Sequence, residues 1–184
     1  MNQDRDPRFE HTEQVIRSTF LDMLRRLNYE SVTVRELTAQ APINRKTFYL
    51  HYDSLDRLLG TMRTESTQKS YDKVKDCRIP DDIPQLVRTL YTYWDSLGED
   101  DFLLWTCTPD RKIGTTFAGQ LLTHGMTFTG RGKDDPAYQH VALLSMAYVL
   151  SAAFIDYKNH GKEEGVTRDA LITQVTDLLE HGLS

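Results

Sequence analysis

The spacing of apolar residues is the feature of this chain that most limits its fold. Phe9, Ile16, Phe20, Leu24 and Leu27 recur about every 3.6 residues, with charged side chains between them. The same spacing continues toward the C-terminus, and no run of alternating apolar and polar residues predicts a strand. The pattern predicts an all-α fold of about nine helices, covering residues 9–27, 34–40, 45–51, 55–75, 86–97, 102–105, 113–121, 137–159 and 167–179. Gly161 is the expected stop signal of the eighth helix.

The composition is typical of a soluble globular protein. Its 184 residues are 39% apolar, enough to bury a core in one domain or in a small domain joined to a larger one. Cys77 and Cys107 lack the CxxC spacing of zinc ligands and are expected to be reduced thiols. The longest uncharged apolar run, Val141 to Ile155, is shorter than the roughly 20 residues that span a bilayer, and Met1 to Phe9 is too polar for a secretory signal. We therefore expect a cytoplasmic protein with no metal, cofactor or membrane partner.

Charge is unevenly distributed along the chain. Residues 1–60 contain as many basic as acidic residues, so the whole net charge of −5 lies beyond them. Between Thr33 and Tyr52, Glu36 is the only acidic residue, whereas Arg35, Arg45 and Lys46 are basic. A positive segment on an acidic protein is what a site-specific nucleic-acid binder needs, although a solvated charge cluster would have the same composition.

Two short helices separated by a proline turn follow the first helix. Thr33 and Glu36 form a capping box that begins the first of them, and Pro42 ends it. Asn44 offers a second N-cap to the helix at residues 45–51. Such a pair, packed on an earlier helix, is typical of a helix-turn-helix. The alternative interpretation is that these are two ordinary turns within an all-α core. The second helix, however, has more hydrogen-bonding side chains than a helix that only packs in the core needs.

The polar side chains of this second helix favour DNA as the partner. A recognition helix enters the major groove N-terminus first, so its first residues would lie nearest the base edges: Asn44, Arg45, Lys46 and Thr47. Arg45 or Lys46 can donate to guanine O6 and N7, and Thr47 can contact a thymine methyl group or a phosphate. Phe48 and Tyr52 are expected to face the core.

The segment Thr33–Leu59 resembles the helix-turn-helix of the TetR/AcrR family of bacterial transcriptional regulators. The resemblance rests on the run Thr-Phe-Tyr-Leu-His-Tyr at residues 47–52, on the Asn44-Arg45 start and on Leu58-Leu59. It covers roughly residues 8–60, and beyond them only an architecture of about nine helices is similar. The form Arg-Lys-Thr-Phe-Tyr-Leu-His-Tyr at residues 45–52 also resembles regulators of dihydroxyacetone-kinase operons.

The resemblance implies a DNA-binding domain in residues 1–60 and a ligand-binding and dimerisation domain in residues 61–184. It implies phosphate contacts from Tyr49 and His51, and contacts of Arg35 and Thr33 with the DNA backbone or a flanking base. The function it implies is a homodimer that binds a palindromic operator in double-stranded DNA and is released by a small-molecule inducer. We expect a repressor, and an activator is the alternative.

Three positions differ from the family's pattern. Pro42 stands where the family has a turn glycine, and it suits a turn residue that donates no N–H. Lys46 replaces a small residue and adds a positive charge on the side expected to face DNA. Leu55 replaces a lysine, so one phosphate contact of the family is missing.

The C-terminal part predicts a dimer interface and a ligand site. Val141–Ile155 is apolar on every face, so one face is expected to pack within the subunit. The opposite face is expected to form a dimer interface together with the last helix. The same two helices of a second subunit, related by a two-fold axis, would complete a four-helix interface. In the family, the elements around the inducer cavity correspond to those that carry Tyr91, Trp94, Trp105, Phe117 and His124. The same aromatic residues could equally fill a solid core.

An enzyme is the main alternative from another class. The six histidines are scattered, without an HExxH or ExxH pair, and the chain has no GxGxxG, Walker lysine loop or GxSxG motif. We therefore expect no catalytic residues. A second alternative is a ligand-binding or adaptor protein that keeps the helix-turn-helix shape without repressing an operator directly.

Overall fold

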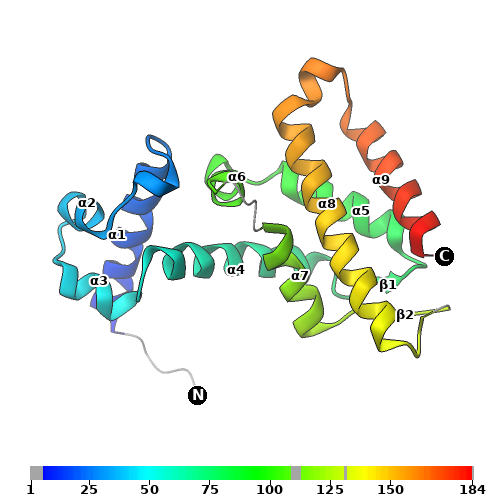
Figure 1. The fold of residues 1–184 in the computed structure, drawn as a ribbon, viewed down its shortest axis with the longest axis horizontal. Helices are drawn as coiled ribbons and strands as arrows, with labels where there is room; N and C mark the ends of the chain where they lie inside the picture. The colour runs from blue at the N-terminus through cyan, green and yellow to red at the C-terminus, as the bar shows by residue number, and fades with distance from the viewer. Residues whose placement is uncertain (1–5, 109–112, 131, 184) are drawn as a thin grey trace. The chain divides into compact units, whose positions relative to one another are not determined.

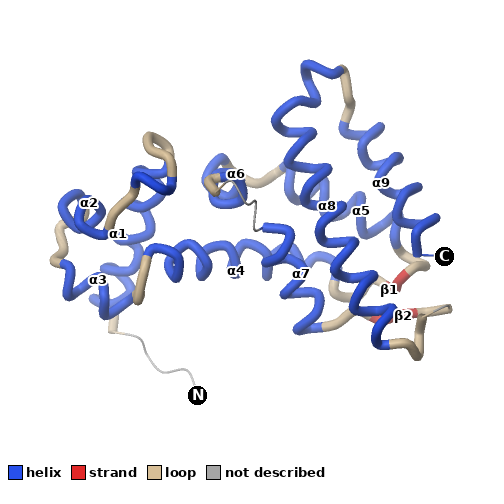
Figure 2. The backbone as a smooth tube through the Cα atoms, in the orientation of Figure 1, coloured by secondary structure: helices blue, strands red, loops and turns tan. Residues whose placement is uncertain are grey.

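The computed structural model describes residues 6–108, 113–130 and 132–183. Helices dominate this part of the chain, as Figures 1 and 2 show, and the all-α prediction is confirmed. The described residues form nine α-helices: α1 (Pro7–Leu24), α2 (Val34–Gln40), α3 (Arg45–His51), α4 (Leu55–Val74), α5 (Ile83–Asp95), α6 (Glu99–Thr106), α7 (Ile113–His124), α8 (Pro136–Glu164) and α9 (Arg168–Leu183). A 3₁₀ turn, η1 (Tyr29–Ser31), lies between α1 and α2.

Polar residues just before the helices fix where they begin. Asp135 Oδ1 accepts hydrogen bonds from the backbone N–H groups of Ala137 and Tyr138, each at 3.0 Å. Thr167 Oγ1 accepts one from the N–H of Ala170 at 3.2 Å. These N–H groups have no acceptor within the first turn of a helix, so each cap satisfies donors that would otherwise be unpaired.

Several helix boundaries differ from the sequence prediction: α1 ends at Leu24 instead of Leu27, α5 begins at Ile83 instead of Leu86, and α9 continues to Leu183. Two further differences have a local physical reason. Gly161 does not stop α8, which continues to Glu164 and ends at Gly165 in the left-handed conformation (φ 69°). A Cβ at Gly161 would lie 2.6 Å from the ring of Tyr157, so glycine here makes room for a side chain. The non-helical gap predicted at residues 98–101, between the helices at 86–97 and 102–105, is also shorter than expected. Glu99–Asp101 forms the first turn of α6. Acidic side chains in a first turn are favoured by the helix dipole.

The expectation of no strand is wrong at one place in the described residues. Strand β1 (Arg78–Ile79) pairs in parallel with β2 (Thr127–Phe128). The N–H of Thr129 extends the pairing by donating to the carbonyl of Ile79 at 2.7 Å. Strands of two residues are too short to show an alternating pattern, so the sequence carried no signal for them.

The chain divides into two compact units. The first contains the described residues of Met1–Met62 and Glu99–Asp110, and the second those of Arg63–Gly98 and Arg111–Ser184. The core of the first unit is formed by fully buried side chains of α1 to α4: Ile16, Phe20, Met23, Leu37, Phe48 and Leu58. In the second unit, Gly114 of α7 allows a close approach to α8, since a Cβ there would lie 2.9 Å from the ring of Tyr148.

Helix α8 is long and apolar enough to cross a membrane by length and composition alone. It is the one such helix among the described residues, with a mean hydropathy of 1.4 over its most apolar window. The core helix of a soluble protein passes the same test, and 44% of this window is buried inside the protein. The expectation of a cytoplasmic protein stays a prediction.

Candidate nucleic-acid interface

Helix α2 begins at the capping box expected from the sequence. The hydroxyl oxygen of Thr33 accepts a hydrogen bond from the N–H of Glu36 at 3.2 Å. The same hydroxyl donates to Glu36 Oε2 at 2.8 Å, so the carboxylate bonds to the side chain of Thr33. Both interactions hold the N-terminal end of α2 in place, with Arg35 exposed in its first turn.

A four-residue turn connects α2 to α3. Ala41 leaves the helical region (φ −76°, ψ 139°), as expected for a residue before Pro42. Asn44 then caps α3: its Oδ1 accepts from the N–H of Thr47 at 2.8 Å and from the hydroxyl of Thr47 at 3.1 Å. Two short helices joined by such a turn and packed beside α1 form a helix-turn-helix.

The inner side of α3 is anchored to α1. Phe48 and Tyr52 are buried, which confirms the expectation that they face the core. The hydroxyl of Tyr52 accepts from Arg17 Nε at 2.9 Å and donates to Glu13 Oε1 at 2.9 Å, while Arg17 Nη2 also contacts Glu13 Oε1 at 2.6 Å. This network ties the end of α3 to the middle of α1 and so fixes which side of α3 faces outward.

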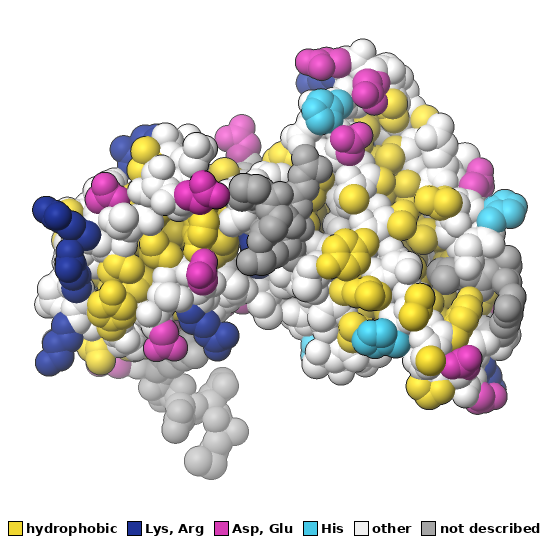
Figure 3. Space-filling model, in the orientation of Figure 1, with side chains coloured by type: hydrophobic (Ala, Val, Ile, Leu, Met, Phe, Trp, Pro, Cys, Tyr) yellow, Lys and Arg dark blue, Asp and Glu magenta, His cyan; other side chains and the backbone are white. Residues whose placement is uncertain are grey.

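The outer side of α3 is positively charged and exposed. Arg45 and Lys46 are exposed, and within the described part of the chain neither has an ion-pair or hydrogen-bond partner for its side chain. Tyr49 is also exposed. Figure 3 shows Lys and Arg side chains along the edge of the first unit, where α2 and α3 lie in the same view. Unpaired exposed cations on a short helix suit the phosphates and base edges of DNA.

His51 lies at the C-terminal end of α3 in a partly buried position. Its ring stacks on Phe9 of α1 with ring centroids 3.8 Å apart, and its Nδ1 is buried without a hydrogen-bond partner. Desolvation lowers the pKa of His51, and the nearby Glu13 carboxylate opposes this by raising it. Its expected phosphate contact stays a prediction, and only Nε2 can make that contact, because Nδ1 is buried.

Leu50 is a residue of α3 that the sequence reasoning missed. Its side chain is 69% exposed, more than that of any other large apolar residue in the described chain. The signal was present in the sequence, since Leu50 follows Lys46 by four residues and therefore lies on the same helix face.

The candidate ligand residues divide between the two units. Tyr91, Trp94 and Phe117 come together in the second unit: Trp94 lies 5.7 Å from the ring of Tyr91 and 5.7 Å from that of Phe117 between centroids. All three are buried, as is Trp105, which belongs to the first unit. His124 is exposed at the end of α7, where its Nε2 contacts Gln68 Oε1 at 3.1 Å.

Polar groups of this aromatic cluster are already hydrogen-bonded inside the protein. The hydroxyl of Tyr91 donates to the carbonyl of Leu150 at 3.0 Å, and Trp94 Nε1 donates to Ser70 Oγ at 2.9 Å. A solid core requires that its buried polar groups be hydrogen-bonded, and these two contacts meet that requirement. Burial raises the pKa of Tyr91. Two pockets of the described residues lie elsewhere, one along α8 and α9 and one between η1 and the end of α6.

Among the residues that the structure describes, no group of three or more His, Cys, Asp or Glu side chains could hold a metal ion.

Comparisons with known proteins give one similarity. Over 78 residues, the chain is 31% identical to a protein of Bacillus subtilis (strain 168) named "Uncharacterized HTH-type transcriptional regulator YxbF". The match covers 42% of this chain and 20% of that protein, so it spans about a fifth of the length of the relative. No family model matches the chain, and no solved structure matches it.

Proposed function

We propose that this protein is a DNA-binding transcriptional regulator of the TetR/AcrR type that uses α2 and α3 as its helix-turn-helix. The observation that carries the proposal is the two-sided character of α3. Phe48 and Tyr52 anchor one side, and Arg45 and Lys46 stand exposed and unpaired on the other. The similarity to a helix-turn-helix transcriptional regulator supports the same reading.

Roles for the individual side chains follow from this placement. Arg45 and Lys46 would donate to bases or phosphates, and Tyr49 and His51 would donate to phosphates. Arg35, in the first turn of α2, would contact the DNA backbone, and Thr33 would hold that turn in place, because its hydroxyl hydrogen is donated to Glu36 Oε2. Phosphate contacts of this kind set the position of the protein on DNA, and base contacts select the sequence.

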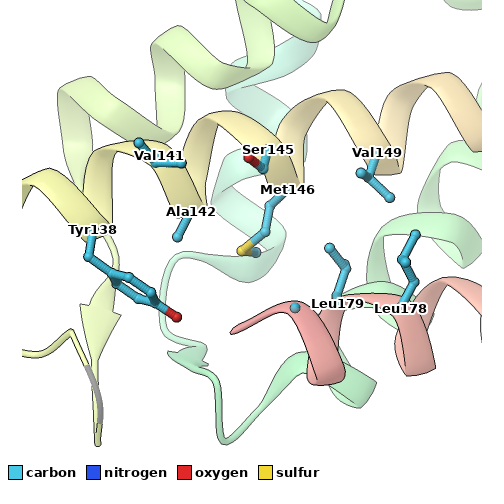
Figure 4. Close-up of a pocket in the computed structure, with 9 residues that line it drawn as sticks. Tyr138, Val141, Ala142, Ser145, Met146, Val149, Leu178 and Leu179 are labelled. Carbon is cyan, nitrogen blue, oxygen red and sulfur yellow. The ribbon is translucent and has the colours of Figure 1, made fainter. Parts of the chain in front are cut away.

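Residues 61–184 would form the dimerisation and ligand-binding domain. A groove of about 330 Å³ runs along α8 and α9, and its apolar lining includes Met146 and Leu179. Figure 4 shows the side chains around this groove. Val141 of α8 is 60% exposed and Leu178 of α9 is 59% exposed. We propose that a second copy covers this surface in a two-fold dimer, which would make the operator a palindrome.

The proposal includes control by a small-molecule inducer. Helix α4 is shared by both units, because its residues up to Met62 belong to the first and those from Arg63 to the second. A ligand that binds the non-DNA conformation more tightly would lower operator affinity, typically by about 5–150-fold. We propose that a ligand bound near Trp94 releases the protein from its operator and that the bound protein represses transcription. We also propose that the protein is cytoplasmic and has no catalytic activity. Activation, or an adaptor role without direct repression, is the second candidate.

DNA binding by the full chain tests the proposal. Genomic fragments bound by the protein are selected, and the affinity for a selected duplex is measured by fluorescence anisotropy over a range of salt concentrations. Arg45→Ala should relax the preference at one base position per half-site, and Lys46→Ala should weaken binding. Lys69→Ala is the matched control, because it removes one exposed positive charge from α4 outside the helix-turn-helix.

The outcomes separate the alternatives. A loss of at least tenfold for the α3 variants, with Lys69→Ala unchanged, supports recognition through α3. Equal effects of all three substitutions would show only a general response to charge and would contradict the assignment of α3. Failure of the wild-type protein to retain any fragment would favour the adaptor reading.

A further inference from the structure

Helical geometry defines which side chains of α3 point away from the first unit. Successive residues of an α-helix are rotated by about 100° around its axis. With Phe48 buried, the opposite direction is occupied by Lys46 and Leu50, which are one turn apart. Arg45 and Tyr49 lie on one side of this pair, and Thr47 lies on the other. Around the helix axis, Leu50 therefore lies near the middle of the outward face, and along the axis it is the sixth of the seven residues of α3.

An exposed leucine at this position has no partner within the described chain. At 69% exposure, its apolar surface would gain free energy from contact with another apolar group. The exposed cation Lys46 lies one turn before Leu50 on the same face, and Arg45 lies further round the same short helix. Their charge favours a polyanion as the occupant over a second apolar protein surface. Within the major groove of DNA, the C5-methyl group of thymine is the apolar feature.

Thr47 lies beside Leu50, and its hydrogen bond restricts what it can contact. Its hydroxyl has one hydrogen, which is donated to Asn44 Oδ1 at 3.1 Å. The identity of that atom as oxygen is fixed, because the same atom accepts from the backbone N–H of Thr47 at 2.8 Å. A phosphate oxygen only accepts hydrogen bonds, so Thr47 in this arrangement has no hydrogen left to offer one. Its methyl group remains available for an apolar contact.

We propose that Leu50 and the methyl group of Thr47 read thymine C5-methyl groups in the major groove, so that each operator half-site contains thymine beneath α3. This inference rests on the proposed function, because it assumes that α3 enters the groove. It assigns sequence discrimination to Leu50, a side chain with no hydrogen-bonding group. Of the two contacts expected for Thr47, it selects the thymine methyl group over the phosphate.

Replacement of single thymines by deoxyuridine tests the proposal, because uracil lacks only the methyl group. Each thymine of the selected half-site is replaced in turn, and the affinity of the wild-type protein is measured for every duplex. At one or two positions we expect a loss of about fourfold for each methyl group removed. The same series is then measured with Leu50→Ala and with Thr47→Ser, which keeps the hydroxyl and removes the methyl group.

The double comparison assigns each position to a residue. Leu50→Ala should bind the thymine duplex more weakly and should no longer respond to deoxyuridine at one of the sensitive positions. Thr47→Ser should lose its response at the neighbouring position. Because Leu50 is exposed, its substitution should leave the thermal unfolding midpoint unchanged, and Leu50→Asn provides a second variant with the same expected result.

Two results would overturn the proposal in distinguishable ways. If wild-type protein binds the operator, and Arg45→Ala weakens it, but no thymine responds to deoxyuridine, the methyl contacts do not exist and the DNA-binding function stands. An unchanged operator affinity of Leu50→Ala would likewise show that Leu50 makes no methyl contact, while the DNA-binding function stands. The exposed leucine would then be assigned to contact with a protein partner. If wild-type protein binds no DNA, both the proposed function and this inference fail.

Discussion

The ring of Phe9 stacks on the imidazole of His51, with ring centroids 3.8 Å apart and an angle of 23° between the ring planes. Phe9 lies in the first turn of α1 and His51 is the last residue of α3, so the stack joins the two ends of the segment that carries the helix-turn-helix. It leaves the Nδ1 atom of His51 buried and without a hydrogen-bond partner. A protonated imidazole would have to place an N–H there without an acceptor.

The stability of the protein should therefore fall in mild acid. Burial lowers the pKa of His51 below the value of about 6.5 of an exposed histidine, so the unfolded chain binds the proton more tightly than the folded one. The stabilising contribution of neutral His51 is complete above the pKa of this histidine in the unfolded chain. It is lost as the pH falls through the lower pKa that His51 has in the folded protein. Thermal unfolding of wild type and of His51→Gln between pH 5 and pH 8 measures this. The variant should show a shallower decline, and identical pH profiles would contradict the assignment.

Tyr52 should contribute more to stability than its exposed neighbour Tyr49. Tyr52→Phe removes the group that bonds to both Arg17 and Glu13 in a half-buried setting, and we expect a loss of about 1–3 kcal/mol in the free energy of unfolding. Tyr49→Phe is the control for folding and should change the free energy by less than about 0.5 kcal/mol. Urea unfolding followed by circular dichroism distinguishes them. For DNA affinity, Tyr49→Phe should have the larger effect of the two substitutions, and it should weaken binding to all DNA sequences equally.

Substitution of Trp94 separates a solid core from a ligand pocket. If the buried aromatic cluster only fills the core, Trp94→Ala should cost about 3–5 kcal/mol of stability. Ser70→Ala, which removes the Oγ atom that accepts from the indole N–H of Trp94, should then cost about 1–3 kcal/mol. A well-folded Trp94→Ala protein that binds operator but no longer responds to an inducer would support a pocket instead. Chemical denaturation gives the first result, and operator release gives the second.

Charge on the outer surface of α8 and α9 should dissociate the proposed dimer. Val141→Glu or Leu178→Glu would bury a carboxylate in an apolar interface, so we expect monomers in sedimentation velocity at micromolar concentration. Thr173→Glu adds the same charge at an exposed position of α9 that is rotated by about 140° from Leu178, and it should leave the dimer intact. A monomeric wild-type protein under the same conditions would refute dimerisation through this surface.

Two glycines within helices should respond to alanine in opposite directions. Gly60 in α4 has open space around the position of a Cβ, so Gly60→Ala should raise the free energy of unfolding by about 1 kcal/mol through helix propensity. At Gly161 the added Cβ would lie 2.6 Å from Tyr157, and Gly161→Ala should lower stability despite the same gain in propensity. Urea unfolding of both variants measures the difference, and a gain at Gly161 would show that Tyr157 moves away at little cost.

The helix starts of α2, α3, α8 and α9, each of which carries a capping side chain, were predicted from the sequence, because the interactions that decide them are short-ranged. The hydrogen bonds of Thr33, Asn44, Asp135 and Thr167 each reach an N–H within three residues, so the residues that decide them are adjacent in the chain. The side of α3 that faces inward was also predictable, since Phe48 and Tyr52 are four residues apart on one face of a short helix.

Features that depend on distant residues were decided only by the tertiary structure. The passage of α8 through Gly161 and the pairing of residue 78 with residue 127 have no local signal, because glycine is a common stop and two-residue strands show no pattern. The buried Nδ1 of His51 depends on its surroundings at the end of α3, among them the ring of Phe9, which lies 42 positions earlier in the chain (51 minus 9). Local sequence thus determined the helices and their caps, whereas packing between distant segments determined which side chains of α3 are left free to meet a partner.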